Sequence, residues 1–291
     1  MNRNTTGFLY RFGQRTYDLS ARTYIIGVLN VTPDSFSDGG RYVDPDRAVD
    51  HALGMIEEGA DIVDVGGEST RPKSVAYGEG AEPVPVEEEV RRVIPVIKNL
   101  VRQTNVPVSI DTFKSAVASR ALDEGAVIVN DVSGFAFDAE MPHVVAERGA
   151  SAILMHIKGT PKTMQQNPTY DDLFGEVIAY LSAGLRKGEE QGIHQLIVDP
   201  GIGFGKTVEH NLRLIKGLNR LKDLGYPVLV GPSRKSFIGT ILDLPVEERL
   251  EGTLAACVAS ILHGANMLRV HDVRAAKRAA TMIDALKSVT V

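Results

Sequence analysis

Polar or charged side chains follow eight short apolar segments of this sequence, at the point where each segment ends. The positions are Asn30, the Thr70 and Arg71 pair, Asp111, Asn130, His156, Asp199, Lys235, and the Arg269 and His271 pair. Each position alone is explained as well by the polarity of loops as by a function. Eight together favour a shared site, provided that the fold brings the ends of the segments to one place.

The basic members of this set suit an anion. Arg269 and His271 are two residues apart in an apolar segment, so in a strand they share a face. A buried arginine is costly unless it meets an anion, which can be a ligand or a carboxylate of the protein itself. Lys235 and Arg269, beside a glycine-rich turn, suit phosphate or pyrophosphate. His271 and Asn30 are candidate further partners, or a route to Mg²⁺.

The acidic and amide members have the opposite character. Asp111, Asn130 and Asp199 can accept hydrogen bonds from a flat ring whose edge presents several N–H donors. No pair of histidines or cysteines has the spacing of a zinc site, and no Gly-x-Ser-x-Gly segment is present. We therefore expect a site that holds a donor-rich heterocycle at one end and an anion at the other.

The segment DPGIGFGKT at residues 199–207 opens a glycine-rich turn directly behind a carboxylate. A phosphate-binding P-loop would need glycine where Pro200 stands, and a dinucleotide fingerprint would need glycine in place of Lys206. The segment instead predicts a strand, a carboxylate at its end and a tight turn into a helix that begins near Val208.

Apolar runs and helical patterns alternate along the chain. The predicted strands are residues 24–30, 61–65, 107–111, 126–130, 151–156, 196–198, 227–231 and 267–271. A helix is predicted after each strand, with Asp46 as the N-cap candidate of the first helix and Pro95 as a kink or restart in the second. Short strands that are apolar on both faces indicate a parallel sheet, and eight such units favour a closed barrel over an open doubly wound sheet.

Residues 8–12 and 15–19 predict a β-hairpin about a two-residue turn, placed to cap the barrel. We therefore predict an α/β fold, a (β/α)₈ TIM barrel with an N-terminal β-hairpin. The prediction is a single domain over residues 1–291, with the hairpin in residues 1–22 and the barrel in residues 23–291. Residues 253–262 are apolar almost all round, which predicts a helix buried on both sides or placed in a subunit interface.

The 291 residues carry a net charge of −5 and have a pI near 5.8, which argues against a general nucleic-acid-binding protein. The N-terminal residues include arginines but no apolar segment of the signal type, and the apolar runs are shorter than a membrane span. We therefore expect a cytoplasmic protein without a membrane partner. The single cysteine, Cys257, is expected in the core.

Six segments, in order, resemble the motifs of the dihydropteroate synthase family of pterin-binding TIM barrels. They are GVLNVTPDSFSDGG at residues 27–40, DVGGESTRP at 64–72, VNDVSG at 129–134, DPGIGFGK at 199–206, SRKSFIG at 233–239 and LRVHDV at 268–273. The resemblance implies a homodimeric transferase that acts with Mg²⁺ in folate biosynthesis and is a target of sulfonamides. Such an enzyme joins 6-hydroxymethyl-7,8-dihydropterin diphosphate to p-aminobenzoate, giving 7,8-dihydropteroate and pyrophosphate.

The resemblance also implies roles for individual positions. The pterin diphosphate would be bound by Asp111, Asn130, Asp199, Lys235, Arg269 and His271, with Asn30 toward the metal. p-Aminobenzoate would lie near Thr70, Arg71, Pro72, Phe204, Ser233 and Lys235. The catalytic residues would be Lys235, Asp111 and Arg269. Residues 32–41 and 71–85 would order over bound pyrophosphate and exclude water.

Three other functions remain open. Lys73 replaces the glycine that commonly follows Ser-Thr-Arg-Pro in the family, which motivates a non-catalytic or divergent pterin-binding paralogue. A folate-dependent methyltransferase uses a similar barrel, yet no segment resembles an accompanying cobalamin-binding region. A lyase with Lys235 as a Schiff base is disfavoured, because the lysine has polar sequence neighbours and a lowered pKa would need an apolar pocket.

Overall fold

The structure is a computed structural model that describes residues 7–32, 44–69 and 83–290. Its main sheet has eight parallel strands. They are β3 (Tyr24–Asn30), β4 (Ile62–Gly66), β5 (Val108–Asp111), β6 (Ile128–Asp131), β7 (Ser151–Met155), β8 (Leu196–Asp199), β9 (Leu229–Val230) and β10 (Met267–Val270). Their order in the sheet is β8-β7-β6-β5-β4-β3-β10-β9.

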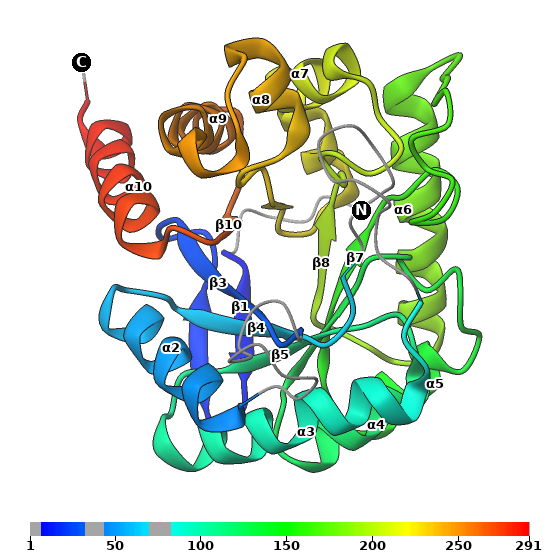
Figure 1. Ribbon diagram of the computed structural model, residues 1–291. Helices are drawn as coiled ribbons and strands as arrows, with labels where there is room; N and C mark the ends of the chain where they lie inside the picture. Colours follow the sequence, from blue (N-terminus) through cyan, green and yellow to red (C-terminus); the bar gives the residue numbers. More distant parts are fainter. Residues whose placement is uncertain (1–6, 33–43, 70–82, 291) are drawn as a thin grey trace.

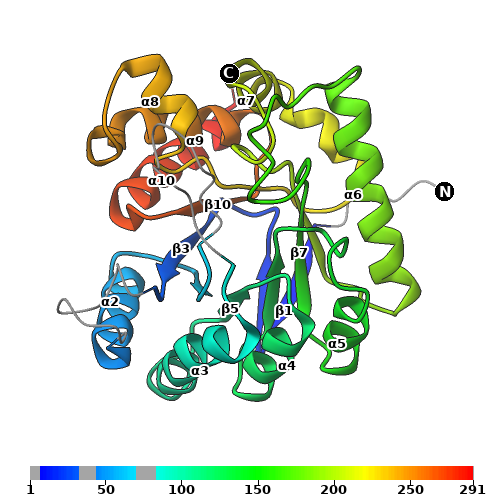
Figure 2. The same cartoon turned by 45° about the vertical axis from the view of Figure 1, so that its right-hand side comes forward.

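A parallel bridge between Val198 of β8 and Val228, which precedes β9, joins the two edges of this sheet. The sheet is therefore a near-closed barrel, and helices surround it on the outside (Figures 1 and 2). The predicted (β/α)₈ TIM barrel is confirmed, and the open doubly wound sheet is wrong.

Side chains alternate between the inside and the outside of the barrel along each strand. One layer of the interior, near the amino ends of the strands, is made of large apolar side chains. They are Ile26, Ile62, Ile128, Ile153, Ile197, Leu229 and Met267. Outward side chains such as Val63, Val129 and Leu154 belong to a second core, under the helices. The alternation makes the residue two positions after each inner-layer side chain point inward as well.

The N-terminal hairpin covers the amino end of the barrel. Its antiparallel strands β1 (Leu9–Phe12) and β2 (Arg15–Asp18) confirm the predicted pairing. Tyr10 and Phe12 pack on the inner layer, and the Tyr10 hydroxyl donates a hydrogen bond to the Leu196 carbonyl at 2.6 Å. The hairpin thus shares an apolar cluster with the barrel, whereas the proposed division at residue 22 stays a prediction.

Helices connect the barrel strands on the outside. They are α2 (Pro45–Glu57), α3 (Val86–Gln103), α4 (Ser115–Asp123), α5 (Met141–Glu147), α6 (Leu173–Glu190), α7 (Val208–Lys216), α8 (Ser236–Leu242), α9 (Leu250–Leu262) and α10 (Val273–Ser288). Two short 3₁₀ helices, Leu218–Leu224 and Val246–Glu248, complete the connections on either side of β9.

Two local predictions about the helices are corrected. The N-cap of α2 is Asp44, whose carboxylate accepts hydrogen bonds from the N–H groups of Asp46 and Arg47 at 3.0 and 3.3 Å. Pro45 explains the shift of the cap, because proline is favoured in the first helical turn, where its missing N–H has no helical partner. Helix α3 does not restart at Pro95 but continues through it, and the alternative of a kink stays a prediction.

The apolar segment 253–262 lies in α9, which packs against both α8 and α10. Cys257 is buried there, as predicted, whereas the Leu262 side chain is 58% exposed. The helix is therefore buried on one side only. Within residues 7–32, 44–69 and 83–290, no helix has the length and apolar character of a membrane span.

Candidate functional site

A cavity of about 540 Å³ lies at the carboxyl ends of the barrel strands. Strand register places Asn30, Gly66, Asp111 and Asn130 at one level on four neighbouring strands. Nine residues predicted for the site line this cavity. They are Asn30, Asp111, Asn130, Asp199, Phe204, Ser233, Lys235, Arg269 and His271. The strand-end side chains thus converge as the barrel hypothesis requires.

Carboxylates hold the Arg269 guanidinium inside the barrel. Its Nε donates to Asp64 Oδ2 at 2.6 Å, and its Nη2 donates to Asp111 Oδ2, also at 2.6 Å. The Asn130 amide donates to the same Asp64 oxygen at 2.9 Å. A carboxylate of the protein is therefore a partner of Arg269, as one of the two sequence alternatives states, and the pairing orients both Arg269 and Asp111 toward the cavity.

Burial shifts the protonation of the two aspartates that line the cavity. It raises the pKa of Asp199 to about 6, against the opposing effects of the Gly201 N–H, which donates to Oδ1 at 2.6 Å, and of Lys235. Burial also raises the pKa of Asp111, although the Arg269 guanidinium opposes the shift. Carboxyls with raised pKa values in a cleft are typical of functional sites.

The Lys235 amine is withdrawn from water, and this lowers its pKa to about 8, with Arg269 adding to the effect. Its Nζ lies 4.0 Å from the centroid of the Phe204 ring. The sequence argument that polar neighbours would leave this pKa unchanged is wrong, because the tertiary fold and not the adjacent residues surrounds the amine. At pH 7 the lysine is still mainly a cation.

Contacts from three other segments hold the turn before Lys235. Arg234 has a φ of 56°, in the left-handed region that non-glycine residues rarely adopt. Its N–H donates to Thr253 Oγ1 at 3.0 Å, its guanidinium pairs with Asp272, and its carbonyl accepts from Arg249 Nη1 at 3.1 Å. These contacts fix the backbone from which Lys235 reaches the cavity.

His271 is a neutral member of the site at pH 7. Burial lowers its pKa to about 3, and the neighbouring Arg269 lowers it further. Ser233 Oγ lies 3.1 Å from Nδ1 and accepts a hydrogen bond from the His271 backbone N–H at 3.2 Å. Attraction of an anion therefore falls to Lys235 and Arg269, and His271 can contribute only a hydrogen bond.

Asn30 is the position predicted closest to a metal, and it lines the cavity. Mg²⁺ prefers oxygen ligands and is commonly held by one or two protein groups together with substrate phosphates. Among residues 7–32, 44–69 and 83–290, no cluster of three or more His, Cys, Asp or Glu side chains could hold an ion. The donor set thus fits an ion carried by a diphosphate, with Asn30 as a protein ligand, better than a resident metal centre.

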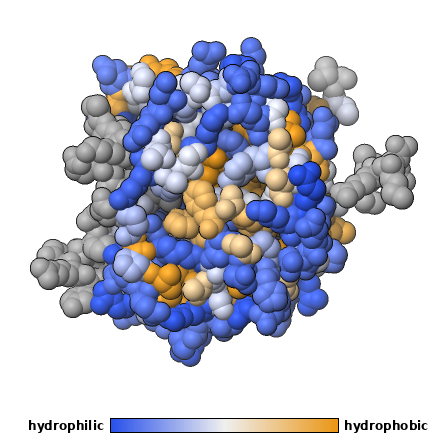
Figure 3. Space-filling model, turned by 90° about the vertical axis from the view of Figure 1, so that its right-hand side faces the viewer, coloured by the Kyte–Doolittle hydropathy of each residue, from blue (hydrophilic) through white to orange (hydrophobic). Residues whose placement is uncertain are grey.

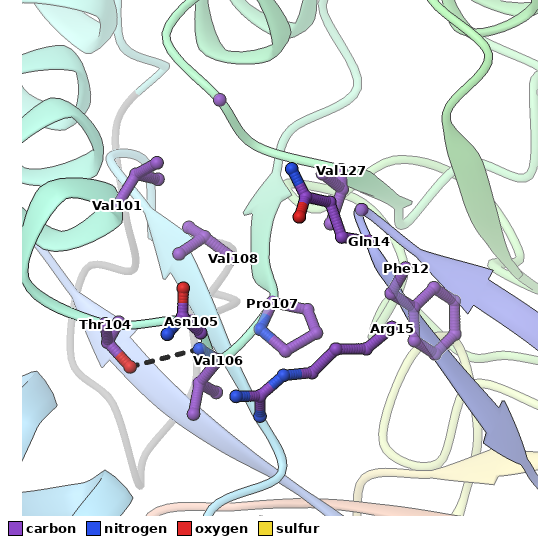
Figure 4. A pocket seen from close by; sticks show the side chains of 12 residues that line it. Phe12, Gln14, Arg15, Val101, Thr104, Asn105, Val106, Pro107, Val108 and Val127 are labelled. Atoms are coloured by element: carbon purple, nitrogen blue, oxygen red, sulfur yellow. Dashed lines mark hydrogen bonds between the residues drawn. The ribbon is translucent and has the colours of Figure 1, made fainter.

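A second hollow, of about 470 Å³, lies at the other end of the barrel, between the hairpin turn and the end of α3 (Figure 4). Phe12, Pro107 and Val127 are among its apolar lining residues, and Arg15 is the one charged residue that contributes to its described lining. A catalytic site normally has several convergent titratable groups, so this hollow is not the candidate.

A family model described as pterin binding enzyme matches residues 26–271. The dihydropteroate synthase of Synechocystis sp. is 48% identical over 277 residues, which cover 94% of this chain and 93% of that protein. The chain belongs to the pterin-binding enzyme family.

Solved structures of similar proteins agree with this membership. The dihydropteroate synthase from Xanthomonas albilineans in complex with 7,8-dihydropteroate is 40% identical, with a TM-score of 0.85, and the match covers 97% of this chain and all of that one. The Yersinia pestis dihydropteroate synthase with a sulfonamide drug is 38% identical, with a TM-score of 0.89 and coverage of 97% and 100%. The pterin-binding enzyme described here is thus similar to synthases along nearly its whole length.

Two groups of predicted positions in this pterin-binding enzyme are not part of the described cavity. Thr70, Arg71 and Pro72 lie outside the described residues. His156, at the end of β7, is buried, and its Nδ1 lies 2.9 Å from Lys206 Nζ. The strand-end pattern therefore includes one position that does not line the cavity.

Sequence reasoning missed several residues of the pterin-binding enzyme's site. Asp64 was detectable, because it is a carboxylate two positions after Ile62 in an apolar strand and must share its inward direction. Glu68 and Ser69 line the cavity just beyond the end of the same strand. Glu247 lines it from the connection between α8 and α9, and no sequence signal placed that connection over the barrel.

Proposed function

We propose that the protein is a transferase that joins 6-hydroxymethyl-7,8-dihydropterin diphosphate to p-aminobenzoate, giving 7,8-dihydropteroate and pyrophosphate in folate biosynthesis. The observation that carries this proposal is the composition of one cavity, where hydrogen-bond acceptors and cations lie side by side. Asp111 and Asp199 suit the N–H donors of a pterin, while Lys235 and Arg269 suit the diphosphate.

The chemistry needs charge stabilisation more than proton transfer. The bond from the exocyclic carbon to oxygen breaks with its electron pair, which leaves on pyrophosphate, and the carbon becomes positive. Asp111 and Asp199, fixed by Arg269 and by the Gly201 N–H, are preorganised to stabilise that charge through the ring. The aniline nitrogen then forms the new C–N bond and loses a proton, for which we assign no protein base.

p-Aminobenzoate is proposed to occupy the loop side of the cavity. Phe204 supplies a ring face that already packs on the Lys235 amine, and Ser233 adds a hydroxyl held by His271. Thr70, Arg71 and Pro72, which follow Ser69 in the sequence, remain proposed partners. Sulfonamides, as analogues of p-aminobenzoate, are proposed to compete here.

We propose that Mg²⁺ reaches the site bound to the diphosphate of the pterin substrate. Mg²⁺ bound to the diphosphate would neutralise part of the leaving group's charge, and Asn30 would hold it from β3. Lys235 and Arg269 orient the same diphosphate without depending on the ion.

The decisive experiment supplies both substrates and Mg²⁺ and measures pyrophosphate and dihydropteroate together. Stoichiometric appearance of the two products is expected. Tight binding of the pterin diphosphate without dihydropteroate would instead support the non-catalytic or divergent paralogue that Lys73 motivates. Borohydride trapping of a carbonyl compound on Lys235 would support the lyase, and methyl transfer from methyltetrahydrofolate would support the methyltransferase.

The dependence of kcat/KM on pH should be bell-shaped. Asp199 must be ionised to accept from a pterin, so activity should fall about tenfold per pH unit below its pKa of about 6. Lys235 must be protonated to attract the diphosphate, so activity should fall again above its pKa of about 8. Initial rates at subsaturating pterin diphosphate between pH 5 and 10 measure both limbs. A profile without an acid limb would contradict the role of Asp199.

A homodimer is proposed to form through α8, α9 and α10. Exposed apolar side chains gather on these neighbouring helices, namely Ile241, Leu242, Leu262, Met282 and Leu286. On the face shown in Figure 3, by contrast, hydrophilic residues predominate. Apolar side chains in one exposed region are typical of subunit interfaces.

Leu262→Arg should therefore convert the dimer to monomers, because a charged side chain would enter the proposed interface. Sedimentation velocity measures the change. The matched control is Leu9→Arg, on the N-terminal hairpin and not on these three helices, where the leucine is 69% exposed. Dimers that persist in Leu262→Arg would move the interface elsewhere. The cytoplasmic location stays a prediction.

A further inference from the structure

Lys114 joins three separate segments beside the cavity. It stands between β5 and α4, three residues after Asp111, and its ammonium group is surrounded by oxygen acceptors. Nζ donates to the Glu89 carboxylate of α3 at 2.6 Å, to the Val84 carbonyl at 2.6 Å and to the Glu68 carboxylate. An ammonium group has three donors, so these partners use all of them.

A gain in folding stability does not by itself explain this buried cluster of charges. The side chain of Lys114 is 17% exposed, that of Glu68 11% and that of Glu89 1%. Two carboxylates share one cation, and Glu89 Oε1 is buried without a hydrogen-bond partner among the described residues. Burial raises the pKa of Glu89 despite its contact with Lys114. Replacing buried ion pairs by apolar residues is often neutral or stabilising, so such a cluster points to a requirement for geometry.

The geometry that Lys114 fixes belongs to one wall of the cavity. Glu68 and Ser69 line the cavity directly after β4, and Lys114 binds Glu68 from the end of the next strand. The Gly67 carbonyl is held separately by Arg92 Nη1 at 2.8 Å. The same ammonium binds the Val84 carbonyl, so Lys114 ties Glu68 and Val84 to one point.

The groups proposed to bind the pterin do not depend on this cluster. Asp111 is held by Arg269, Asn130 by Asp64, and Asp199 by the Gly201 N–H. The wall at Ser69 instead leads directly into Thr70, Arg71 and Pro72, the positions proposed for p-aminobenzoate. Loss of Lys114 should therefore affect the two substrates unequally.

We infer that Lys114 is a positioning residue for the p-aminobenzoate side of the site, acting through Glu68 and Ser69. The inference rests on the proposed transferase function. It predicts that the second substrate, and not the pterin diphosphate, is sensitive to the charge at position 114.

The test compares Lys114→Met, which keeps the length of the side chain without its charge, with Lys114→Arg, which keeps the charge. Lys114→Met should raise KM for p-aminobenzoate about tenfold or more, since misplacement of a substrate-positioning group by about 1 Å can cost up to about 100-fold. The dissociation constant of the pterin diphosphate, from calorimetry without p-aminobenzoate, should stay within about twofold. Lys114→Arg should restore most of the loss.

The matched control is Lys98→Met on α3, which removes an exposed lysine that pairs with Glu124 and lies outside the cavity lining. It should change neither constant. Equal weakening of both substrates by Lys114→Met, or an unchanged KM for p-aminobenzoate, would overturn the inference. If Lys114→Met does not fold, Glu68→Gln tests the same wall and should give the same unequal effect.

Failure of the proposed function has a different signature. If the wild-type protein makes no dihydropteroate, calorimetry can still measure binding of p-aminobenzoate to the protein saturated with pterin diphosphate. Lys114→Met should weaken that binding about tenfold, and an unchanged affinity would overturn the inference without reference to turnover.

Discussion

Replacement of Lys235 by alanine should lower kcat/KM for dihydropteroate formation by about 10³-fold, which corresponds to about 4 kcal/mol of transition-state stabilisation. The cavity would lose the cation that lies beside Phe204 and is close enough to Asp199, Asp111 and Arg269 to interact with their charges. Arg269 would remain as a second cation but could compensate only in part, because its guanidinium is already paired with Asp64 and Asp111. Steady-state rates with the pterin diphosphate as the varied substrate measure the loss.

The fold of the Lys235→Ala protein should be intact. The lowered pKa of Lys235 means that its cation is less stable in the folded protein than in water, so its removal should leave the melting temperature unchanged or higher. Lys158→Ala is the control, since Lys158 pairs with Glu176 outside the cavity lining. The alkaline limb of the pH profile should disappear only in Lys235→Ala. Turnover within a few fold of the wild type would remove Lys235 from the site.

Asp199→Asn should lower kcat/KM by at least about 100-fold and at the same time stabilise the protein at pH 8. The activity falls because an amide is a weaker acceptor than a carboxylate and cannot stabilise positive charge. The stability rises because burial disfavours the ionised carboxylate, and a neutral asparagine avoids that cost. The asparagine can still accept the hydrogen bond from the Gly201 N–H.

The direction of the stability effect follows from the raised pKa of Asp199. The folded protein binds the proton more tightly than the unfolded chain, so the contribution of Asp199 is most favourable at low pH and is lost as the pH rises through about 6. At pH 8 the free energy of unfolding of Asp199→Asn should exceed that of the wild type by at most roughly 3 kcal/mol, and this difference should vanish near pH 4. Melting curves of both proteins at the two pH values measure it.

Burial raises the pKa of Asp131 as it does that of Asp199, but the hydrogen bonds of the two carboxylates differ, so Asp131→Asn is a control with the opposite expectation. Both carboxylate oxygens of Asp131 accept N–H groups, from Ser133 at 2.7 Å and from Phe135 at 2.9 Å, and the residue is not part of the cavity lining. An asparagine there would place its NH₂ group against an N–H donor, so this protein should melt earlier. Asp199→Asn with wild-type activity, or with a lower melting temperature at pH 8, would contradict our assignment.

The architecture was predictable because it depends on periodicity. Short apolar runs alternating with helical patterns specify parallel strands, and the period of two along a strand specifies which residues share a face. These rules place Asp111, Asn130 and Asp199 around one opening, and register confirms a common level for Asp111 and Asn130. The hairpin was predictable from its turn.

The remaining features depend on contacts between distant residues. The withdrawal of Lys235 from water is produced by the barrel and not by its sequence neighbours. The left-handed turn at Arg234 depends on contacts with Thr253 and Asp272. The position of Glu247 at the cavity depends on how the connection between α8 and α9 folds. Asp64 is the exception, because its strand position already carried the signal.

The isoleucine layer and the hairpin fill the amino end of the barrel, and the described cavity lies at the opposite end, at the carboxyl ends of the strands. Two substrates that enter through the same opening cannot bind in either order. The substrate that binds in the deeper part of the cavity must enter before the other substrate occupies the opening. The groups on the strands, which are proposed to bind the pterin, lie deeper than the groups on the loops. The pterin diphosphate is therefore expected to bind first. The chemistry of this barrel should consequently follow a compulsory sequence of addition, set by its architecture before any side chain reacts.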